Sequence, residues 1–317
     1  MTGSVARMPC RVGIDVGGTK CLGVRLGDDL GVVTVELRPT PGDPEELVDT
    51  LCELSLTLGP ADTLGIGVPG LVTREGVLRA APHITEVADL PLRTLLEDRL
   101  QRPVSVDNDA TCALVAEATI GAARGATDAI LVTIGTGIGG AILGGGVIQR
   151  GANGFTGEIG HMVVDPDGPP CPCGRRGCWE RFASGSALTR LGQEAAAAGR
   201  LEAVLERRDG RVSDVRGEDV TAAARGGDAG ALAILDDFGR WMAVGLVNLT
   251  NAFDPELFVL GGGLVALQDL VVDPIRAWFG ELLYAPSYRP HPRLEVARLG
   301  ERSGAIGAAL LPASTTT

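Results

Sequence analysis

Short apolar runs that end in glycine recur along the chain. Residues 12–16 (VGIDV) lead into Gly-Gly-Thr-Lys, and a second apolar run, CLGVRL, follows at once. The pattern returns where ILVTI (130–134) leads into GTGIGG (135–140) and then AILGGGVI (141–148). Two apolar runs of strand length separated by a short glycine turn are typical of a β-hairpin. We therefore predict a strand–glycine loop–strand unit in each half of the chain.

A helix is predicted to begin just after the apolar strand PVSV (103–106). Asn108 or Asp107 can cap it, and Asp109 falls in the first turn, where the helix dipole favours a carboxylate. Alanine-rich sequence continues the helix to about Gly121. A carboxylate in this position is often there for capping alone. The functional alternative is that Asp109 is a general base in a cleft and Asn108 binds a hydroxyl beside it.

Helical periodicity marks several later segments. Residues 190–234 predict short amphipathic helices joined by polar loops, with charged residues on a solvated surface and no expected chemistry. Residues 231–253 predict a long buried helix, and residues 303–312 a closing helix. Between them, ELFVL (256–260) followed by glycines predicts a strand and its turn.

Composition limits the classes of function. The chain has 317 residues, of which 45% are hydrophobic and 21% charged, as in ordinary globular proteins. A formal charge of −12 argues against nucleic-acid binding as the main function. Backbone N–H groups can still hold a small phosphate ligand without basic side chains. We recognise no signal peptide and no apolar run of membrane-spanning length, so we expect a cytoplasmic protein with no membrane partner.

Three cysteines and a histidine gather in one loop. From His161 the spacing is H-x9-C-x-C-x4-C, with Cys171, Cys173 and Cys178 as the thiols. One imidazole and three thiolates make a complete tetrahedral shell for zinc, which implies a structural ion rather than a Lewis acid. A set of free cysteines is the plainer alternative, and a redox pair is disfavoured because its usual spacing is C-x-x-C.

The two glycine loops have the composition of phosphate-binding turns. In the first, Asp15 ends the strand, Gly17 and Gly18 free the backbone to approach a ligand, and Thr19 and Lys20 supply a hydroxyl and a charge. The second fits G-x-G-x-x-G, but a dinucleotide site requires a helix after the glycines, and here a strand is predicted. Two such loops facing each other across a cleft would hold a nucleotide triphosphate. Two ordinary glycine hairpins are the structural alternative.

Together these motifs resemble a known family. The segments DVGGTK (15–20), GVPG (67–70), NDA (108–110), GEIGH (157–161) and CPCGRRGCWE (171–180) are similar, in order and spacing, to those of the ROK sugar kinases. The resemblance, closest to the bacterial glucokinase-like members, implies an α/β, two-lobed actin-like ATPase (ribonuclease H-like) fold with a zinc-binding loop. It implies a first lobe of residues 10–120 plus 301–317. Residues 121–300 would form a second lobe with the zinc loop and the sugar and ATP cleft.

The resemblance also implies a role for each matching residue. Asp109 would be the catalytic base that accepts the proton of a sugar hydroxyl. The substrate-binding set would be Gly70, Asn108, Asp109, Glu158, His161 and Glu180. The set for ATP and Mg2+ would be Asp15, Gly17, Gly18, Thr19, Lys20, Gly135, Thr136, Gly137, Gly261, Gly262 and Gly263. The structural Zn2+ would be held by His161, Cys171, Cys173 and Cys178. Zinc would thereby order the loop that carries His161 and Glu180 and shape the sugar pocket.

Departures from the family pattern leave the sugar open. Thr111 replaces the second Asn of the usual NDAN, and His83 stands where glucose-handling members typically have Asn. We expect an ATP-dependent hexokinase acting on the 6-hydroxyl of a hexose, with glucose as the default. An amino sugar such as kanosamine, or a C7-cyclitol, is the main alternative, and polyphosphate is an alternative donor.

Two other classes of function and the assembly remain to be weighed. A sugar-responsive repressor is disfavoured because only about a dozen residues precede the first strand, too few for a helix-turn-helix. A non-catalytic sugar-binding protein is disfavoured by Asp109 together with both loops. The family suggests a homodimer or tetramer, although no sequence feature indicates one.

Overall fold

The structure is a computed structural model that describes residues 10–81 and 89–314. His83 therefore lies outside the described residues. Two compact units make up the chain: residues 1–127, 141–157 and 297–317 form the first, and residues 128–140 and 158–296 form the second. The contacts thus group residues 141–157 with the first unit, whereas the lobe limits expected from the sequence, near residues 120 and 301, stay a prediction.

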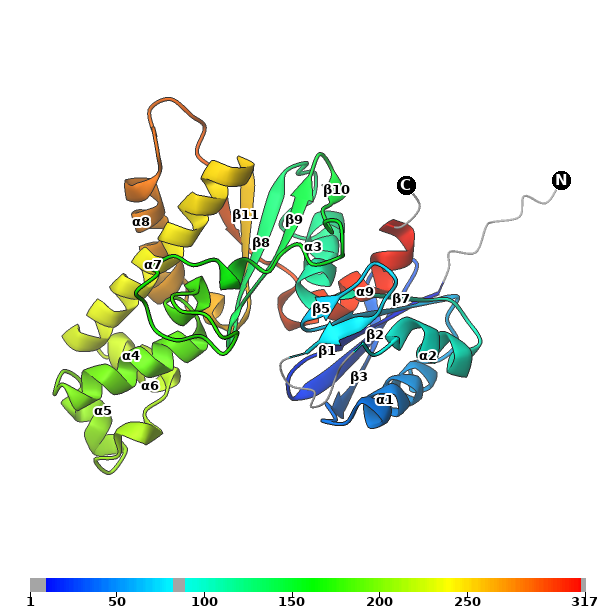
Figure 1. The fold of residues 1–317 in the computed structure, drawn as a ribbon, viewed down its shortest axis with the longest axis horizontal. Coiled ribbons are helices and arrows are strands. Elements are labelled where there is room, and N and C mark those ends of the chain that lie inside the picture. The colour runs from blue at the N-terminus through cyan, green and yellow to red at the C-terminus, as the bar shows by residue number, and fades with distance from the viewer. Residues whose placement is uncertain (1–9, 82–88, 315–317) are drawn as a thin grey trace. The chain divides into compact units, whose positions relative to one another are not determined.

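A five-stranded sheet is the centre of the first unit (Figure 1). Its strands are β1 (Arg11–Val16), β2 (Lys20–Leu26), β3 (Val32–Pro39), β4 (Thr63–Val68) and β7 (Val104–Asn108). The order is β3-β2-β1-β4-β7, with β1, β2 and β3 antiparallel and β4 and β7 parallel to β1. The predicted hairpin of β1 and β2 is confirmed. A small pair, β5 (Leu71–Val72) and β6 (Leu78–Ala80), follows β4.

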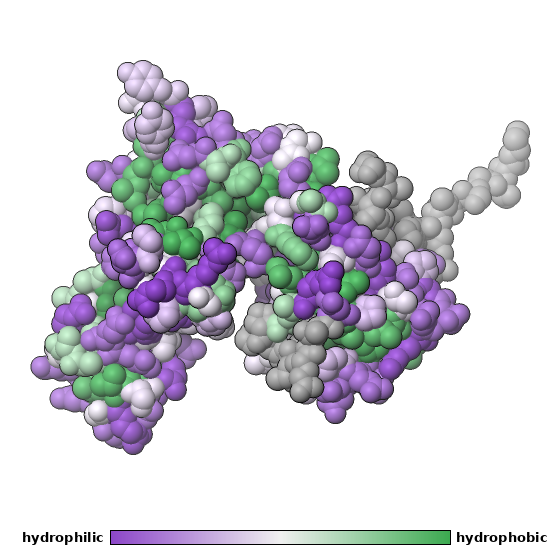
Figure 2. Space-filling view, viewed as in Figure 1, coloured by the Kyte–Doolittle hydropathy of each residue, from purple (hydrophilic) through white to green (hydrophobic). Residues whose placement is uncertain are grey.

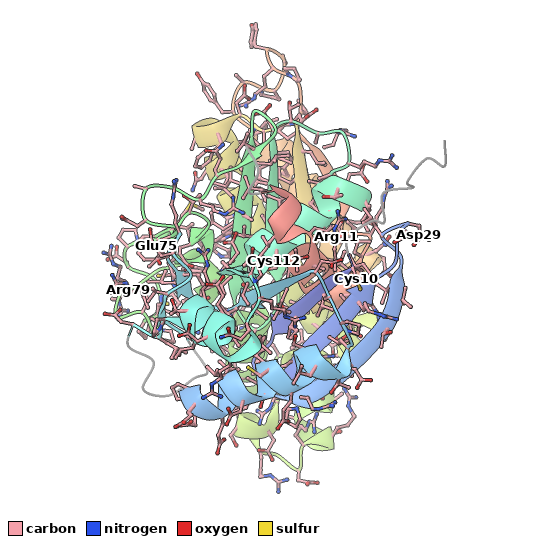
Figure 3. The ribbon with its side chains drawn as sticks, turned by 90° about the vertical axis from the view of Figure 1, so that its right-hand side faces the viewer. Cys10, Arg11, Asp29, Glu75, Arg79 and Cys112 are labelled. Atoms are coloured by element: carbon pink, nitrogen blue, oxygen red, sulfur yellow. The ribbon has the colours of Figure 1, made fainter. Side chains whose placement is uncertain are left out.

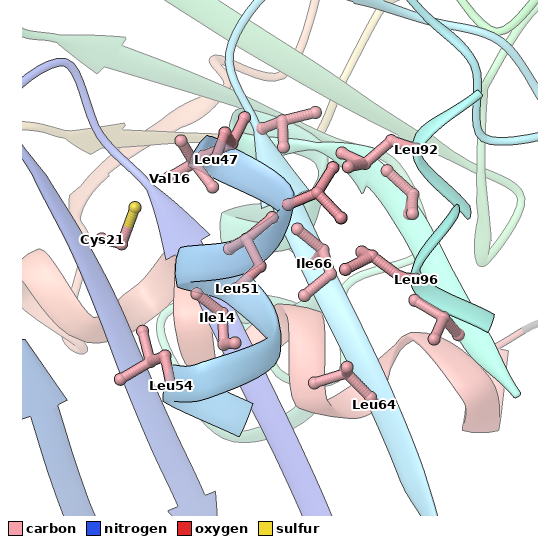
Figure 4. Packing of buried hydrophobic residues seen from close by; sticks show 14 of the residues in the cluster. Ile14, Val16, Cys21, Leu47, Leu51, Leu54, Leu64, Ile66, Leu92 and Leu96 are labelled. Atoms are coloured by element: carbon pink, nitrogen blue, oxygen red, sulfur yellow. The ribbon is translucent and has the colours of Figure 1, made fainter. Parts of the chain in front are cut away.

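One face of this sheet is covered by helices α1 (Pro44–Thr57) and α2 (Leu92–Leu100). Asp43 caps α1 by accepting bonds from the N–H groups of residues 45 and 46. Figure 4 shows Leu47, Leu51 and Leu54 of α1 packed among sheet and α2 side chains, all of them buried. Burying an aliphatic side chain of this size contributes about 1.5–3 kcal/mol, so this layer holds the sheet in place.

The opposite face is covered by α3 (Asp109–Ile120) and α9 (Ser303–Ser314). Glycine allows α9 to approach the strands very closely: a Cβ on Gly65 of β4 would lie 1.8 Å from the carbonyl oxygen of Ala308, and one on Gly13 of β1 2.0 Å from that of Ala305. The predicted closing helix is confirmed, and it packs within the first unit. Its first turn lies against Asp15 of β1, since a Cβ on Gly304 would be 2.5 Å from Cγ of Asp15.

A second five-stranded sheet repeats the topology of the first. Its strands are β8 (Ala129–Ile134), β9 (Ile138–Gly144), β10 (Val147–Ile148), β11 (Leu257–Gly261) and β12 (Arg293–Val296). The order is β10-β9-β8-β11-β12, again with an antiparallel run followed by two strands parallel to the first. The second predicted hairpin is confirmed, and no helix follows its glycines, so a dinucleotide site of the G-x-G-x-x-G type is excluded.

The second unit also contains five α-helices. They are α4 (Gly185–Ala197), α5 (Glu202–Arg207), α6 (Gly217–Arg225), α7 (Ala229–Phe253) and α8 (Asp273–Leu282), with a π-helical turn at Gln268–Val272. The predicted long helix is α7, in which Met242 is fully buried, while Trp241 stacks on Phe182 with ring centroids 4.2 Å apart. Phe258 of β11 and Phe279 of α8 meet edge to face, 6.0 Å apart.

The architecture is the mixed α/β, two-sheet fold that the resemblance implied. Hydrophilic side chains cover most of the face shown in Figure 2. Among the described residues, no helix combines the length and apolar character needed to cross a membrane.

Candidate functional site

The first glycine loop joins β1 to β2. Its turn closes where the N–H of Gly17 donates to the carbonyl of Lys20, 2.9 Å away. Thr40, just after β3, holds the loop from the side: its hydroxyl donates to the carbonyl of Gly17 (2.7 Å) and its N–H to that of Thr19 (3.1 Å). Lys20 forms an ion pair with Glu301 at 2.7 Å. Gly17, Gly18 and Thr19 therefore form an exposed turn with a supported backbone.

Asp15 lies beneath this loop in a confined position. A Cβ on Gly67 would be 3.3 Å from its Oδ1 atom, and one on Gly304 would be 2.5 Å from its Cγ atom. The Oδ1 atom is buried and has no hydrogen-bond partner among the described residues. Burial, and to a lesser extent the nearby carboxylate of Asp109, raises the pKa of Asp15 to about 8. Such a group needs a proton or a cation, so Asp15 fits a magnesium site.

The Asn108–Asp109 pair marks the junction of β7 and α3. Asn108 is the cap: its Oδ1 accepts from the N–H groups of Ala110 (2.9 Å) and Thr111 (3.2 Å). Its Nδ2 donates to the carbonyl of Gly70, 3.2 Å away. Asp109, the first helical residue, accepts at 2.8 Å from the N–H of Ala110. Of the two predicted caps, Asn108 rather than Asp107 is therefore used.

Asp107 instead forms a largely buried ion pair. Its Oδ2 accepts from Nε of Arg150 at 2.8 Å, and its Oδ1 from the N–H of Asn108 at 2.9 Å. On α3, Thr111 is 4% exposed. Cys112, which is labelled in Figure 3, is fully buried. Burial, and then the Asp107 carboxylate, raises the pKa of Cys112 well above its usual range. The residues around Asp109 are thus rigidly held, and Cys112 is an inert core thiol.

The His161, Cys171, Cys173 and Cys178 side chains converge in the second unit. Their candidate ligand atoms all lie within 4.8 Å of one another. Sγ of Cys171 is 3.8 Å from Nδ1 of His161, and Sγ of Cys173 is 3.5 Å from Sγ of Cys178. Three sulfurs and one imidazole nitrogen at this spacing fit the tetrahedral shell of zinc. We refer to these four residues as the cysteine cluster.

Two carboxylates flank the cysteine cluster. Glu158 lies 4.0 Å from Nε2 of His161, while Oε1 of Glu180 lies 3.9 Å from Nδ1 of His161 and 3.3 Å from Sγ of Cys171. The Glu158 side chain is 41% exposed and the Glu180 side chain 18%. With Nδ1 turned toward the sulfurs, Nε2 of His161 is left on the side of Glu158. The arrangement is compatible with the predicted double use of the imidazole.

The second glycine loop, between β8 and β9, borders a cavity. The cavity has a volume of about 920 Å³. Its lining consists of Ile134, Gly135, Thr136, Gly185, Ser186, Leu188, Thr189, Arg216, Gly217, Glu218, Thr221, Ala222, Arg225, Gly263, Leu264 and Leu267. Apolar walls with a few polar groups are typical of a small-molecule site. Gly263 thus lines the cavity, whereas Gly261 ends β11 and Gly262 (φ 89°) lies against the carbonyl of Ile134.

Part of residues 190–234, where the sequence indicated no chemistry, lines this cavity. Four polar residues along α6 and at its N-cap line one side of this cavity: Arg216, Glu218, Thr221 and Arg225. The amphipathic pattern of α6 carries no signal of this role, because the wall exists only once α6 packs beside the second glycine loop. The other charged residues expected on a solvated surface behave as predicted, with Arg211 62% exposed and paired with Asp214.

The predicted substrate-binding and nucleotide-binding sets are each divided between the two units, and only the four predicted zinc ligands lie wholly within one of them. Asp15 with Asp109, and Asn108 with Gly70, belong to the first unit. Glu158, His161, Glu180, the three cluster cysteines and the second glycine loop belong to the second unit.

Comparisons with known proteins agree with the motifs. A family model described as "ROK family" matches residues 11–314. The chain is 36% identical over 308 residues to a glucokinase of Streptomyces coelicolor, covering 95% of this chain and 97% of that protein. It is 34% identical over 328 residues to an N-acetyl-D-glucosamine kinase of Pectobacterium atrosepticum, covering 94% and 97%.

A solved structure gives the same picture. A ROK family glucokinase from Streptomyces griseus, in complex with glucose and AMPPNP, superposes with a TM-score of 0.85. It is 37% identical in sequence, and the match covers 95% of this chain and 98% of that one.

Proposed function

The chain belongs to the ROK family, and from that premise we propose that it is an ATP-dependent kinase that phosphorylates the 6-hydroxyl of a hexose. The observation that carries the proposal is the Asn108–Asp109 junction, a carboxylate in the first turn of a capped helix at the end of β7. A single strand, β4, separates β7 from β1, which carries Asp15, and Oδ1 of Asp15 has no hydrogen-bond partner among the described residues. Two relatives above 30% identity, a glucokinase and an N-acetyl-D-glucosamine kinase, support the proposal.

Asp109 is the general base in this proposal. A sugar alcohol is a weak nucleophile, and a carboxylate within hydrogen-bond reach accepts its proton as the new O–P bond forms. Asn108 and the Gly70 backbone hold a neighbouring hydroxyl, since the bond from Asn108 Nδ2 to the Gly70 carbonyl places both groups together. The tight hydrogen bonding of Asn108 to α3 keeps the base in one orientation, which matters because phosphoryl transfer depends chiefly on positioning.

Glu158, His161 and Glu180 are assigned to the remaining sugar hydroxyls. A site built from carboxylates and an imidazole rejects a sugar of the wrong configuration because its polar groups are left unpaired. Zinc, where bound at the cysteine cluster, supplies no chemistry to the sugar; it orders the loop that carries these residues. Asp15 would hold Mg2+, whose charge offsets that of the nucleotide phosphates.

The 920 Å³ cavity is assigned to the nucleoside. Leu188, Leu264 and Leu267 suit the faces of a base, while Thr189 and Glu218 offer acceptors and a donor to ribose hydroxyls. The glycine loop at its edge, Gly135–Gly137, is assigned to the phosphates, as is Gly17–Thr19. An enzyme that uses ATP in this way belongs to the cytoplasm, where we place it.

The identity of the sugar is the finer part of the proposal. Glucose is the first candidate, because the glucokinase homologues reach 36–37% identity. A relative at 34% identity is an N-acetyl-D-glucosamine kinase, so a modified sugar stays an alternative substrate. Thr111, which departs from the family motif, is 4% exposed.

A coupled assay of ADP release over a panel of sugars tests the proposal. The panel holds glucose, mannose, glucosamine, N-acetylglucosamine, kanosamine and a C7-cyclitol, each with ATP or polyphosphate. We expect glucose with ATP to give the highest kcat/KM. A 6-deoxy sugar serves as the control that lacks the acceptor hydroxyl and should give only background. Absence of turnover with every sugar would contradict the proposal.

A further inference from the structure

The residues that follow the last cluster cysteine lead directly to the second glycine loop. We call residues 178–186 the connecting segment. At its start, Cys178 is a member of the cysteine cluster. At its end, the first residues of α4 donate to the loop: the N–H of Gly185 to the carbonyl of Gly135 (2.8 Å) and that of Ser186 to the carbonyl of Thr136 (3.1 Å). The loop is thus held by N–H groups that a helix start leaves available.

Trp179 anchors the connecting segment near its start. This side chain is completely buried, and its Nε1 donates to the carbonyl of Trp241 on α7 at 2.8 Å. Its N–H donates to the carbonyl of Met162, next to His161, at 2.8 Å. A Cβ on Gly245 of α7 would lie 2.0 Å from the indole, so this glycine makes room for it. The part of the segment next to the cysteine cluster is therefore tightly packed against α7.

Glu180 makes a second, direct connection. Its Oε1 lies 3.3 Å from Sγ of Cys171, and its Oε2 lies 2.6 Å from the position that a Cβ on Gly137 would take. One carboxylate therefore lies against both the cysteine cluster and the glycine loop. Gly137 tolerates it only because it has no side chain.

We infer that the connecting segment makes the cysteine cluster a determinant of nucleotide affinity, by positioning the loop Gly135–Gly137. The inference rests on the proposed function for the identity of the ligand, phosphates of ATP. It extends the role of the metal from the sugar side of the site to the phosphate side. The residues of the segment are positioning residues: they fix the loop backbone, and the loop N–H groups bind phosphate.

The inference predicts a specific pattern of binding. Removing the metal, with a chelator or by Cys173→Ser, should weaken binding of a non-hydrolysable ATP analogue by about 10-fold, a typical size for coupling between two sites. Adenosine, which lacks phosphates, should lose markedly less. Calorimetry gives the affinities, elemental analysis the metal content, and circular dichroism the integrity of the fold. Cys173 is exposed, so its replacement disturbs the core little.

A pair of tryptophan variants tests the segment with the metal in place. Trp179→Phe removes the indole bond to Trp241 but no cluster ligand. Trp278→Phe is the matched control. Trp278 lies on α8, and its Nε1 also donates a hydrogen bond, to Asp236 on α7 at 2.9 Å. We expect both variants to keep one zinc per chain, and only Trp179→Phe to weaken binding of the ATP analogue, by several-fold. This pair decides the matter if the metal-free protein unfolds.

Two results would overturn the inference: a folded, metal-free protein that binds the ATP analogue as tightly as the loaded one, or a Trp179→Phe variant indistinguishable from Trp278→Phe. Failure of the proposed function looks different. In that case no sugar of the panel is phosphorylated, while binding of the ATP analogue still depends on the metal.

Discussion

The two sheets share one topology but support their glycine loops by different means. In each, an antiparallel run of three strands is followed by two parallel strands, and the loop joins the first two strands of the run. The first loop is held locally by Thr40, a residue at the end of the third strand. The second is held by the start of α4, far along the chain and directly after the cysteine cluster.

The chemistry is divided just as unevenly. Two residues before the loop, the first hairpin has Asp15, and the second hairpin has Thr133 at the same position. Asp109 also belongs to the first sheet, at the end of β7. The second unit instead contains the cavity of about 920 Å³ and the cysteine cluster. In the proposed function, the first sheet therefore supplies the base and the magnesium ligand, and the second supplies most of the nucleotide-binding surface.

The largest expected effect comes from removing the base of the first half. Asp109→Asn keeps the shape of the side chain and should lower kcat by about 10²–10⁴-fold, the usual contribution of a general base. Affinity for the ATP analogue should stay close to that of the wild type, because the cavity belongs to the second unit. Steady-state kinetics and calorimetry measure the two quantities.

Asp273→Asn is the control for this variant. Asp273 also lies in the first turn of a helix, α8, but is exposed and pairs only with a surface arginine, Arg276, at 3.2 Å. It should leave kcat unchanged. If Asp109→Asn turned over at the wild-type rate, the division of chemistry between the halves would be wrong.

A smaller effect is expected from the titration of Asp15. Its folded-state pKa of about 8 lies above the ordinary 3.8, so the folded protein keeps a proton that the unfolded chain has lost. Stability should therefore fall as pH rises from about 4 to 8 without Mg2+, by at most about 1.4 kcal/mol per pH unit. Asp15→Asn should remove this contribution, and Mg2+ should restore stability at pH 8 in the wild type alone.

Urea unfolding midpoints at several pH values measure this difference. Thr133→Val, at the matching position of the second hairpin, is the control and should leave the pH dependence as in the wild type. Equal pH dependence in Asp15→Asn and wild type would show that Asp15 is ionised, and therefore satisfied, in the folded protein.

The smallest effect concerns the support of the first loop. Thr40→Val removes the bond to the Gly17 carbonyl, whose net contribution is about 0.5–1.5 kcal/mol, so KM for ATP should rise by about 2- to 10-fold with little change in KM for sugar. Thr34→Val, on β3, is the control. The effects of Thr40→Val and of metal removal on the affinity for ATP should be additive, because the two loops have separate supports. A strongly non-additive combination would contradict that separation.

Local patterns carried much of the fold. Both hairpins, the capped helix at Asn108, the long helix α7 and the closing helix α9 were predicted, because each depends on periodicity, capping residues or glycine turns within a short segment. The same holds for the cysteine cluster, whose four ligands are close in sequence. The cavity of about 920 Å³ was not predicted. Its walls come from α4, α6 and the turn after β11, which meet only through packing.

What the sequence alone determined is the family and those elements whose signal is local, such as the two glycine hairpins, the capped helix after residue 108 and the H-x9-C-x-C-x4-C loop. Only the tertiary structure decided which residues act on which. It placed the carboxylate of Glu180 between the cysteine cluster and Gly137, and it gave Oδ1 of Asp15 no hydrogen-bond partner within the described part of the chain. It also set the N–H groups of residues 185 and 186 against a loop about fifty positions earlier. The physical reason is that burial and hydrogen-bond completion depend on distances in space, which spacing along the chain does not encode.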